Sequence, residues 1–368
     1  MVALAKPIRR IETAKDVALD SYARVQELLA SDKPNANALF QAVADAYGVL
    51  SPELGLMPED VPTLFSDAQI ANSIVDMQST FAEAERTMEQ IRGRAIAGKS
   101  NVSVEDLRLA PFYSGFYHLT EMEEALLAAH GHRVDQGEKQ EGALKTAFIG
   151  ISAIPLSPFL LHTKTVTEID IIDYQGESVE IGQTIANKLG ANLRINFINK
   201  KPQDHDYTDY HTVFVAARAK PKEGIVQKLT QYSNVQFMVM RVVDQRAKLF
   251  FQHLQPASVA KQGFALLHVS HPPPPFFQTA LLFENMNFSE MSNRKSMYVP
   301  WAMTDEMYNH WYTPGSGGGG WHNLLYSADQ TSEMLTSYVQ TKGRSAYKLS
   351  AEGKVTVGPD SPARIKIR

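Results

Sequence analysis

The stretch from Phe148 to Asp173 constrains the fold of this chain most, because two apolar runs enclose a turn and an amphipathic segment. An apolar run, a turn closed by Pro155, an amphipathic stretch and a second apolar run ending in an acid are typical of the first half of a nucleotide-binding α/β unit. The turn holds a single glycine, Gly150, where a dinucleotide loop has three. It therefore favours a nucleoside ligand without phosphates, such as S-adenosylmethionine.

Short apolar runs after residue 144 predict the strands of one sheet. We expect strands near 145–150, 166–173, 193–198, 211–216, 235–241, 263–269 and 276–283. Helical stretches between the first five indicate a parallel sheet covered on both faces. The last two runs are joined by Ser270–Pro275, which is too short for a crossover helix, so they predict an antiparallel hairpin at one edge. The prediction is an α/β fold with a class I methyltransferase-like Rossmann sheet over residues 143–285.

The segments on either side of this sheet have different compositions. Apolar residues at helical spacing between residues 12 and 98 predict an N-terminal all-helical domain over residues 1–142, and this pattern by itself requires only packing. Residues 286–368 hold all three tryptophans, Trp301, Trp311 and Trp321. So many aromatic rings are costly to leave in water, and we expect this extension to dock as a dimer arm or as an active-site lid.

Composition excludes several function classes. A net charge of −4 from 36 basic and 40 acidic residues gives no broad field for nucleic acid or anionic lipid. The chain has no cysteine, which excludes disulfides, thiolate zinc sites and a cysteine nucleophile. The histidine pairs lack a recognisable third ligand, so we expect no metal site. With neither a signal-peptide core nor a long apolar run, the sequence predicts a cytoplasmic protein that acts on a small molecule, and a homodimer is left open.

Four blocks in order carry a resemblance to a known family. They are PFYSGFYHLTEMEEALL from Pro111, FIGISAIPLS from Phe148, the pair YHTVFVAA and VMRVVDQRAKLFF, and GFALLHVSHP from Gly263. From about Ala110 to Phe283 the chain resembles nicotianamine synthases and their bacterial relatives of staphylopine-type metallophore assembly, a group related to S-adenosylmethionine cyclases that form azetidine-2-carboxylate. The resemblance implies delivery of the 3-amino-3-carboxypropyl arm of S-adenosylmethionine to an amine, with release of 5′-methylthioadenosine.

The resemblance also implies roles for residues in the aromatic block. The attacking nitrogen must be neutral, so a base has to accept its proton. The family uses a glutamate with nearby tyrosines, which makes Glu123 the expected base and Tyr113 and Tyr117 its expected partners. Glu123 lies at the edge of an apolar helical stripe, where a carboxylate could face a pocket rather than water.

Residues at the ends of the predicted strands are expected to bind the cofactor. We assign the loop from Gly150 through Ser152 to Pro155 to the methionine end. The acid that ends the second strand, Asp173, is placed to accept hydrogen bonds from the ribose hydroxyls. The further cofactor-binding residues that we expect are Tyr174, Asn199, Ala216 and Arg241.

Departures from the family pattern leave the nucleophile open. Gly115 and Phe116 stand where plant members have an asparagine and a tyrosine, so an amide and a hydroxyl are missing, and Pro273–Phe277 replaces a polar stretch. A less polar acceptor region allows either transfer to an external amine or attack by the ligand's own α-amine, which gives azetidine-2-carboxylate. A conventional methyltransferase and a non-catalytic cofactor-binding protein are the alternatives on the same fold.

Overall fold

The computed structural model describes most of the chain up to residue 287. The described residues are 2–49, 60–108, 110, 112–129, 145–150, 153–162, 168–190, 194–243, 246–252, 254, 256–270, 278–287, 347–349 and 355–357. Ser152 and the tryptophans Trp301, Trp311 and Trp321 lie outside them, so the expectations placed on these residues stay predictions.

A seven-stranded sheet forms the centre of the molecule, with the strand order β3-β2-β1-β4-β5-β7-β6. The strands are β1 (Lys145–Ile149), β2 (Ile169–Asp173), β3 (Ile195–Asn199), β4 (Tyr210–Val215), β5 (Phe237–Val243), β6 (Phe264–Ser270) and β7 (Gln278–Asn285). The first five run parallel, and β7 lies antiparallel between β5 and β6. The predicted class I methyltransferase-like sheet with its antiparallel edge hairpin is confirmed.

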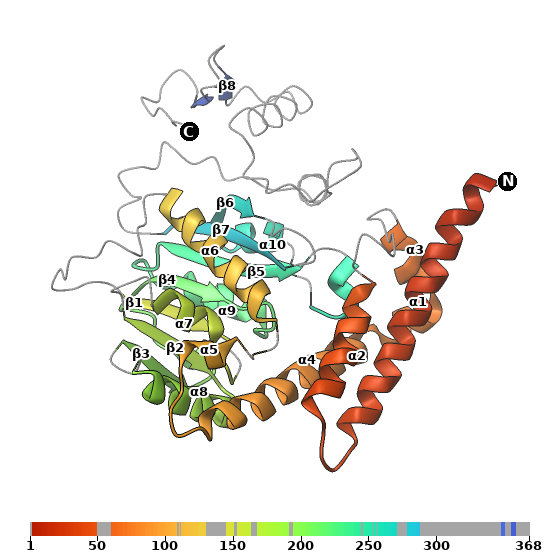
Figure 1. Ribbon diagram of the computed structural model, residues 1–368. Helices are drawn as coiled ribbons and strands as arrows, with labels where there is room; N and C mark the ends of the chain where they lie inside the picture. Colours follow the sequence, from red (N-terminus) through yellow and green to blue (C-terminus); the bar gives the residue numbers. More distant parts are fainter. Residues whose placement is uncertain are drawn as a thin grey trace.

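Helices cover both faces of the sheet (Figure 1). They are α5 (Val104–Leu107), α6 (Tyr113–Ala129), α7 (Leu156–His162), α8 (Gly176–Leu189), α9 (Lys222–Leu229) and α10 (Pro256–Lys261). Side chains alternate along β1, so that Phe148 packs with the core of α6, α7 and α8 whereas Ala147 and Ile149 pack with that of α9 and α10. On the first of these faces Phe148 and Phe214 stack with ring centroids 4.3 Å apart.

One of the predicted connecting helices is absent between β3 and β4. A short 3-10 helix, η3 (Pro202–Asp204), takes its place. Pro202 restricts the backbone there, and the following Asp204, His205 and Asp206 favour turns over a continued helix. Our expectation of helices between all of the first five strands was therefore wrong at this crossover.

The N-terminal helices pack against one end of the sheet. They are α1 (Val2–Leu29), α2 (Ala36–Gly48), α3 (Val61–Ser66) and α4 (Ala68–Ala97). Their apolar stripes form a third core with Val243 at the end of β5 and with the segment that follows η4 (Arg246–Leu249). The long helix α4 continues from α1 and α2 to α8 beside the sheet, as Figure 1 shows. Helix α4 thus contacts both the helical segment and the sheet.

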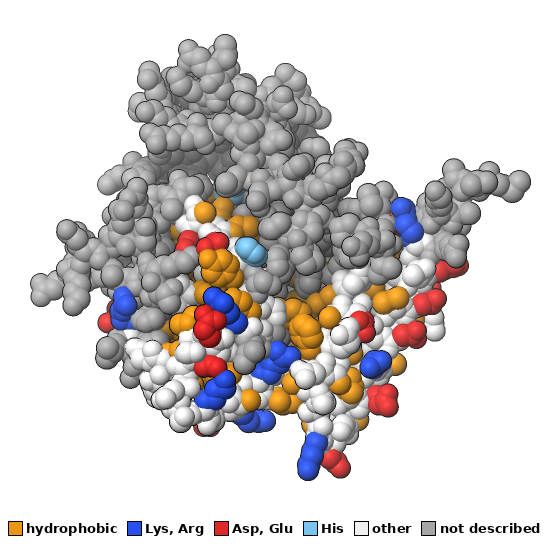
Figure 2. All heavy atoms as spheres, in the orientation of Figure 1, with side chains coloured by type: hydrophobic (Ala, Val, Ile, Leu, Met, Phe, Trp, Pro, Cys, Tyr) orange, Lys and Arg blue, Asp and Glu red, His pale blue; other side chains and the backbone are white. Residues whose placement is uncertain are grey.

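Two further short strands lie in the C-terminal part of the chain. They are β8 (Tyr347–Leu349) and β9 (Val355–Val357), and they pair antiparallel. Near the sheet, the face in Figure 2 shows basic and acidic side chains intermixed over the coloured residues, in keeping with the small net charge of the sequence.

Candidate active site

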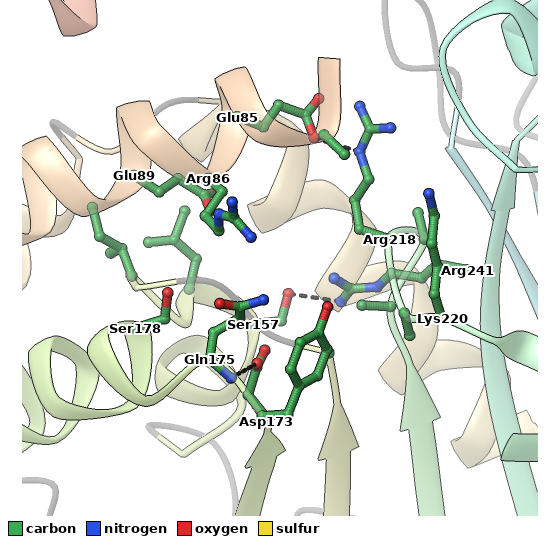
Figure 3. A pocket seen from close by; sticks show the side chains of 18 of the residues that line it. Glu85, Arg86, Glu89, Ser157, Asp173, Gln175, Ser178, Arg218, Lys220 and Arg241 are labelled. Carbon is green, nitrogen blue, oxygen red and sulfur yellow. Dashed lines mark hydrogen bonds and ion pairs between the residues drawn. The ribbon is translucent and has the colours of Figure 1, made fainter. Parts of the chain in front are cut away.

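A cavity of about 380 Å³ opens at the carboxyl ends of the parallel strands. Its walls come from the segments that follow β1, β2 and β4, from Arg241 on β5 and from one face of α4. Figure 3 shows Glu85, Arg86 and Glu89 of α4 across from Asp173 and Gln175 after β2. Ligands of open α/β sheets bind at this edge, so the cavity is the candidate active site.

Asp173 and Tyr174 form the wall at the end of β2. Asp173 is buried, and its Oδ1 accepts a hydrogen bond of 2.8 Å from the backbone N–H of Gln175. Tyr174 lines the same wall with 53 % of its surface exposed. A buried carboxylate beside an exposed aromatic ring suits a ligand that carries vicinal hydroxyls and a flat base.

Gly150 brings the loops after β1 and β4 into contact. Its φ is +77°, and a Cβ atom at this position would lie 2.7 Å from Cβ and 2.9 Å from Cα of Ala219. Only glycine fits such a backbone and such a close approach. The single glycine of the loop therefore packs two walls of the cavity together, and Ala216 and Ala217 line the cavity beside it.

Glu123 and Arg241 form a buried ion pair behind the cavity. Arg241 donates from Nε and Nη2 to the two carboxylate oxygens of Glu123, each at 2.7 Å, and from Nη2 to Oγ of Ser157 at 2.7 Å. Glu123 is 0 % exposed and Arg241 is 5 % exposed. Arg241, Ser157 and Phe116 line the cavity, whereas Glu123 is not among the described residues that do. Glu123 thus contacts the cavity through the guanidinium of Arg241.

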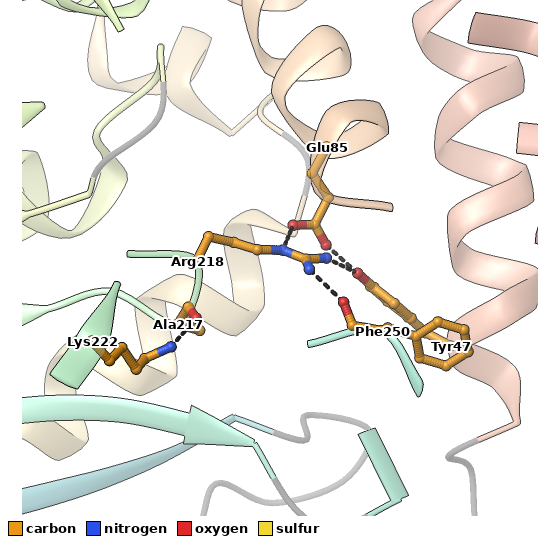
Figure 4. Close-up of polar contacts among 6 residues, drawn as sticks. All are labelled: Tyr47, Glu85, Ala217, Arg218, Lys222 and Phe250. Atoms are coloured by element: carbon orange, nitrogen blue, oxygen red, sulfur yellow. Dashed lines mark hydrogen bonds and ion pairs between the residues drawn. The ribbon is translucent and has the colours of Figure 1, made fainter. Parts of the chain in front are cut away.

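A second arginine, which is partly buried, reaches the cavity from the loop after β4. Arg218 donates from Nε to Glu85 on α4 at 2.7 Å and from Nη2 to the hydroxyl of Tyr47 on α2 at 2.8 Å, and the Tyr47 hydroxyl donates to Glu85 (Figure 4). Its guanidinium carbon lies 3.7 Å from the ring centroid of Phe251. Burial and the charge of Glu85 raise the pKa of Tyr47 well above its usual value, so this hydroxyl stays protonated.

Lys222 is buried just outside the cavity. Its Nζ donates to the carbonyl of Ala217, and 2 % of the residue is exposed (Figure 4). Burial, with the nearby charges of Arg218 and Lys220, lowers the pKa of Lys222 to about 7.

Sequence reasoning missed the contribution of α4. We assigned only packing to the apolar stripe of this helix, but its opposite face brings Ser79, Glu85, Arg86 and Glu89 to the cavity. Ser79 and Arg86 are seven residues apart, Arg86 and Glu89 three, and Glu85 and Glu89 four, which places them along one side of a helix. That polar stripe was the available signal.

Several other predicted residues lie away from the cavity lining. Tyr113 and Tyr117 stack on α6 with ring centroids 6.4 Å apart, while Phe116 faces the cavity instead. Asn199 is exposed at the end of β3, next to Gly176. Pro155 is buried, and its carbonyl accepts the first hydrogen bond of α7 from Phe159 at 3.1 Å. The roles assigned to these residues stay predictions.

Within the described residues, no cluster of three or more metal-ligating His, Asp or Glu side chains occurs. None of the helices described there is long and apolar enough to span a bilayer.

A comparison with protein families matches residues 13–289 to the model described as nicotianamine synthase protein. The chain belongs to the nicotianamine synthase family. Nicotianamine synthase 9 of Hordeum vulgare is 24 % identical over 252 residues, covering 66 % of this chain and 69 % of the relative. Nicotianamine synthase 1 of the same plant is 24 % identical over 264 residues, covering 64 % of this chain and 78 % of the relative.

Solved structures of this family share the fold. MtNAS in complex with MTA and tNA superposes with a TM-score of 0.62 at 17 % identity, covering 73 % of this chain and 97 % of MtNAS. A glutamate-to-glutamine variant of MtNAS in complex with S-adenosylmethionine superposes with a TM-score of 0.59 at 17 % identity, covering 72 % of this chain and 97 % of the variant. At this identity the likeness supports the nicotianamine synthase fold.

Proposed function

We propose that this family member binds S-adenosylmethionine in the cavity at the carboxyl edge of the sheet and releases 5′-methylthioadenosine from it. The observation that carries the proposal is that the buried carboxylate of Asp173 and the exposed ring of Tyr174 line one cavity with the basic side chains of the loop after β4 and of β5. Asp173 would accept hydrogen bonds from the ribose hydroxyls, and Tyr174 would cover the adenine. The methionine end would then lie toward the loop after β4 and Arg241.

The proposed reaction forms a C–N bond and breaks a C–S bond. A neutral amine attacks the γ-carbon of the aminocarboxypropyl arm, the electron pair of the breaking C–S bond passes to the sulfonium sulfur, and a proton leaves the nitrogen for a base. All three carbons on the sulfonium are activated alike, so the product is decided by which carbon the nucleophile meets in line.

Two carboxylates compete for the role of base. Glu123 is the residue that the resemblance suggests, whereas Glu85 lines the cavity directly. Each carboxylate is paired with an arginine, so the ion pairs do not distinguish the two glutamates. They differ in whether the carboxylate can reach a ligand in the cavity. We therefore propose Glu85 as the base, with Glu123 holding Arg241 in place, because a proton acceptor must come within hydrogen-bonding reach of the amine.

The size of the cavity favours cyclisation over transfer. About 380 Å³ is near the lower end of the range of roughly 300–1,000 Å³ for small-molecule pockets. Such a volume suits one nucleoside ligand whose own α-amine folds back on the γ-carbon, giving azetidine-2-carboxylate. Membership in a family of nicotianamine synthases supports the second candidate, transfer to an external amine.

The deciding experiment incubates the purified chain with S-adenosylmethionine and no added amine. Mass spectrometry should detect 5′-methylthioadenosine and azetidine-2-carboxylate in equal amounts, above an enzyme-free control that corrects for spontaneous breakdown. Formation of 5′-methylthioadenosine only after an amine is added would assign transfer instead. S-adenosylhomocysteine as the sole nucleoside product, with or without candidate acceptors, would overturn the proposal in favour of methyl transfer.

A further inference from the structure

The basic side chains of the cavity differ in whether they have a carboxylate partner. Arg86 pairs with Glu83, Arg218 with Glu85 and Arg241 with Glu123. Lys220 lines the same cavity, and among the residues described in the structure it has no ion-pair partner. Among the described residues, Lys220 is thus a lining cation that no carboxylate pairs with.

The position of Lys220 favours binding of an anion. It ends the loop that passes over Gly150 and follows Arg218 at a distance of two residues in the chain. Partial burial and the nearby positive charge of Arg218 lower its pKa from the usual value for lysine. A ligand carboxylate would offset both effects, because an opposite charge favours the protonated amine.

A neutral hydrogen-bond acceptor, Gln278, lines the same cavity. Gln278 is the first residue of β7 and pairs in register with Val243 at the end of β5. Its Oε1 is buried, and within the described part of the chain it receives no hydrogen bond. A buried carbonyl without a donor carries an unfavourable desolvation cost, which a ligand N–H group would offset.

We propose that Lys220 and Gln278 recognise the amino-acid end of the ligand, with Lys220 binding the α-carboxylate and Gln278 Oε1 accepting a hydrogen bond from the α-amino group. This assignment rests on the proposed function and specifies how that site selects its ligand. A hydrogen bond to one N–H fixes the orientation of the nitrogen, and therefore the direction of the lone pair that attacks the γ-carbon. Ligands that are nucleosides without this amino-acid end would not use either residue.

The test compares two ligands that share the nucleoside and differ at the other end. S-adenosylhomocysteine carries the α-amino and α-carboxylate groups and does not react, whereas 5′-methylthioadenosine lacks both. Calorimetric titration of the full chain with each ligand gives the two dissociation constants. The variants are Lys220→Met and Gln278→Leu, with Lys261→Met on the exposed end of α10 as the control.

We expect Lys220→Met and Gln278→Leu each to raise the dissociation constant of S-adenosylhomocysteine by about tenfold or more, as for a lost hydrogen bond to a charged group. The dissociation constant of 5′-methylthioadenosine should change by less than about twofold. Unchanged binding of 5′-methylthioadenosine also shows that each variant is folded. If the variants weaken the binding of both ligands equally, or of neither, the roles assigned to Lys220 and Gln278 are overturned but the proposed function is not. A wild-type chain that binds neither ligand would overturn the proposed function as well.

Discussion

Arg241 on β5 meets Glu123 on α6 through two hydrogen bonds of 2.7 Å, and Nη2 of the same guanidinium bonds to Ser157 on α7. Three elements that are distant in sequence are therefore joined at one buried charge pair next to the cavity. Breaking such a pair by removing one partner leaves a buried charge without compensation, which costs about 3–5 kcal/mol.

Replacing Glu123 alone should destabilise the fold. We expect Glu123→Leu to lower the free energy of unfolding by about 3–5 kcal/mol, and the double variant Glu123→Leu/Arg241→Met to recover most of that loss. Urea unfolding followed by circular dichroism measures both values. A single variant as stable as the wild type would contradict the structural role of the pair.

The two glutamates should differ in their effect on turnover. Glu85→Gln should slow release of 5′-methylthioadenosine at least about a hundredfold, the reach of one acid–base group, while binding of 5′-methylthioadenosine is kept. Glu123→Gln should act chiefly through stability, with turnover recovering at lower temperature. A hundredfold loss confined to Glu123→Gln, in protein that remains folded, would return the role of base to Glu123.

Gly150 offers a test with a matched control inside the chain. Gly150→Ala should cost more than about 3 kcal/mol, because backbone strain and overlap with Ala219 add. Gly190 at the end of α8 has a similar φ of +72° with no atom within 4 Å of the new Cβ, so Gly190→Ala should cost only about 1 kcal/mol of strain. Equal losses of unfolding free energy in the two variants would contradict the close packing of the two loops.

Lys222 should make stability depend on pH. Its pKa is about 7 in the folded chain and higher in the unfolded one, so between these values the unfolded state binds more protons and stability rises with pH. The cost of burying the charge is full below pH 7 and declines above it. The free energy of unfolding of the wild type, relative to that of Lys222→Met, should therefore rise by on the order of 1 kcal/mol per pH unit between pH 7.5 and 9.5. A difference that does not change with pH in urea unfolding would contradict this.

Asp173 should contribute to the binding of every ligand that carries the ribose. Asp173→Ala should weaken the binding of S-adenosylhomocysteine and of 5′-methylthioadenosine alike, each by about tenfold or more. Both ligands carry the ribose hydroxyls from which the carboxylate would accept hydrogen bonds. Calorimetric titration measures both. If only the binding of S-adenosylhomocysteine were weakened, Asp173 would instead lie at the amino-acid end of the ligand.

The sheet could be predicted because its strands are short, mostly apolar runs separated by turns and helical stretches, as in Ile169–Asp173, where every residue is buried. The acid at the end of this strand was predictable for the same reason, since strand ends meet at one edge. Contacts between side chains that are far apart in the sequence could not be predicted. Nothing local to Glu123 indicates that Arg241, 118 residues later, meets it.

The faces of helices were harder to assign than their positions. Tyr113 and Tyr117 were chosen because they precede Glu123 closely in sequence, but the helix turns Phe116 to the cavity instead. On α4 the apolar face dominated the pattern, so only packing was assigned to this helix. A second element has to be placed before such a face can be recognised as the wall of a site.

Helix α4 contributes cavity residues from one face and packs with α1 and α2 through another. Binding at the cavity and docking of the N-terminal helices are therefore linked equilibria. A ligand that contacts Glu85 or Glu89 strengthens the attachment of the helical segment by the same free energy with which that attachment strengthens its own binding. Substitutions in α1 or α2 can thus alter affinity without touching the ligand.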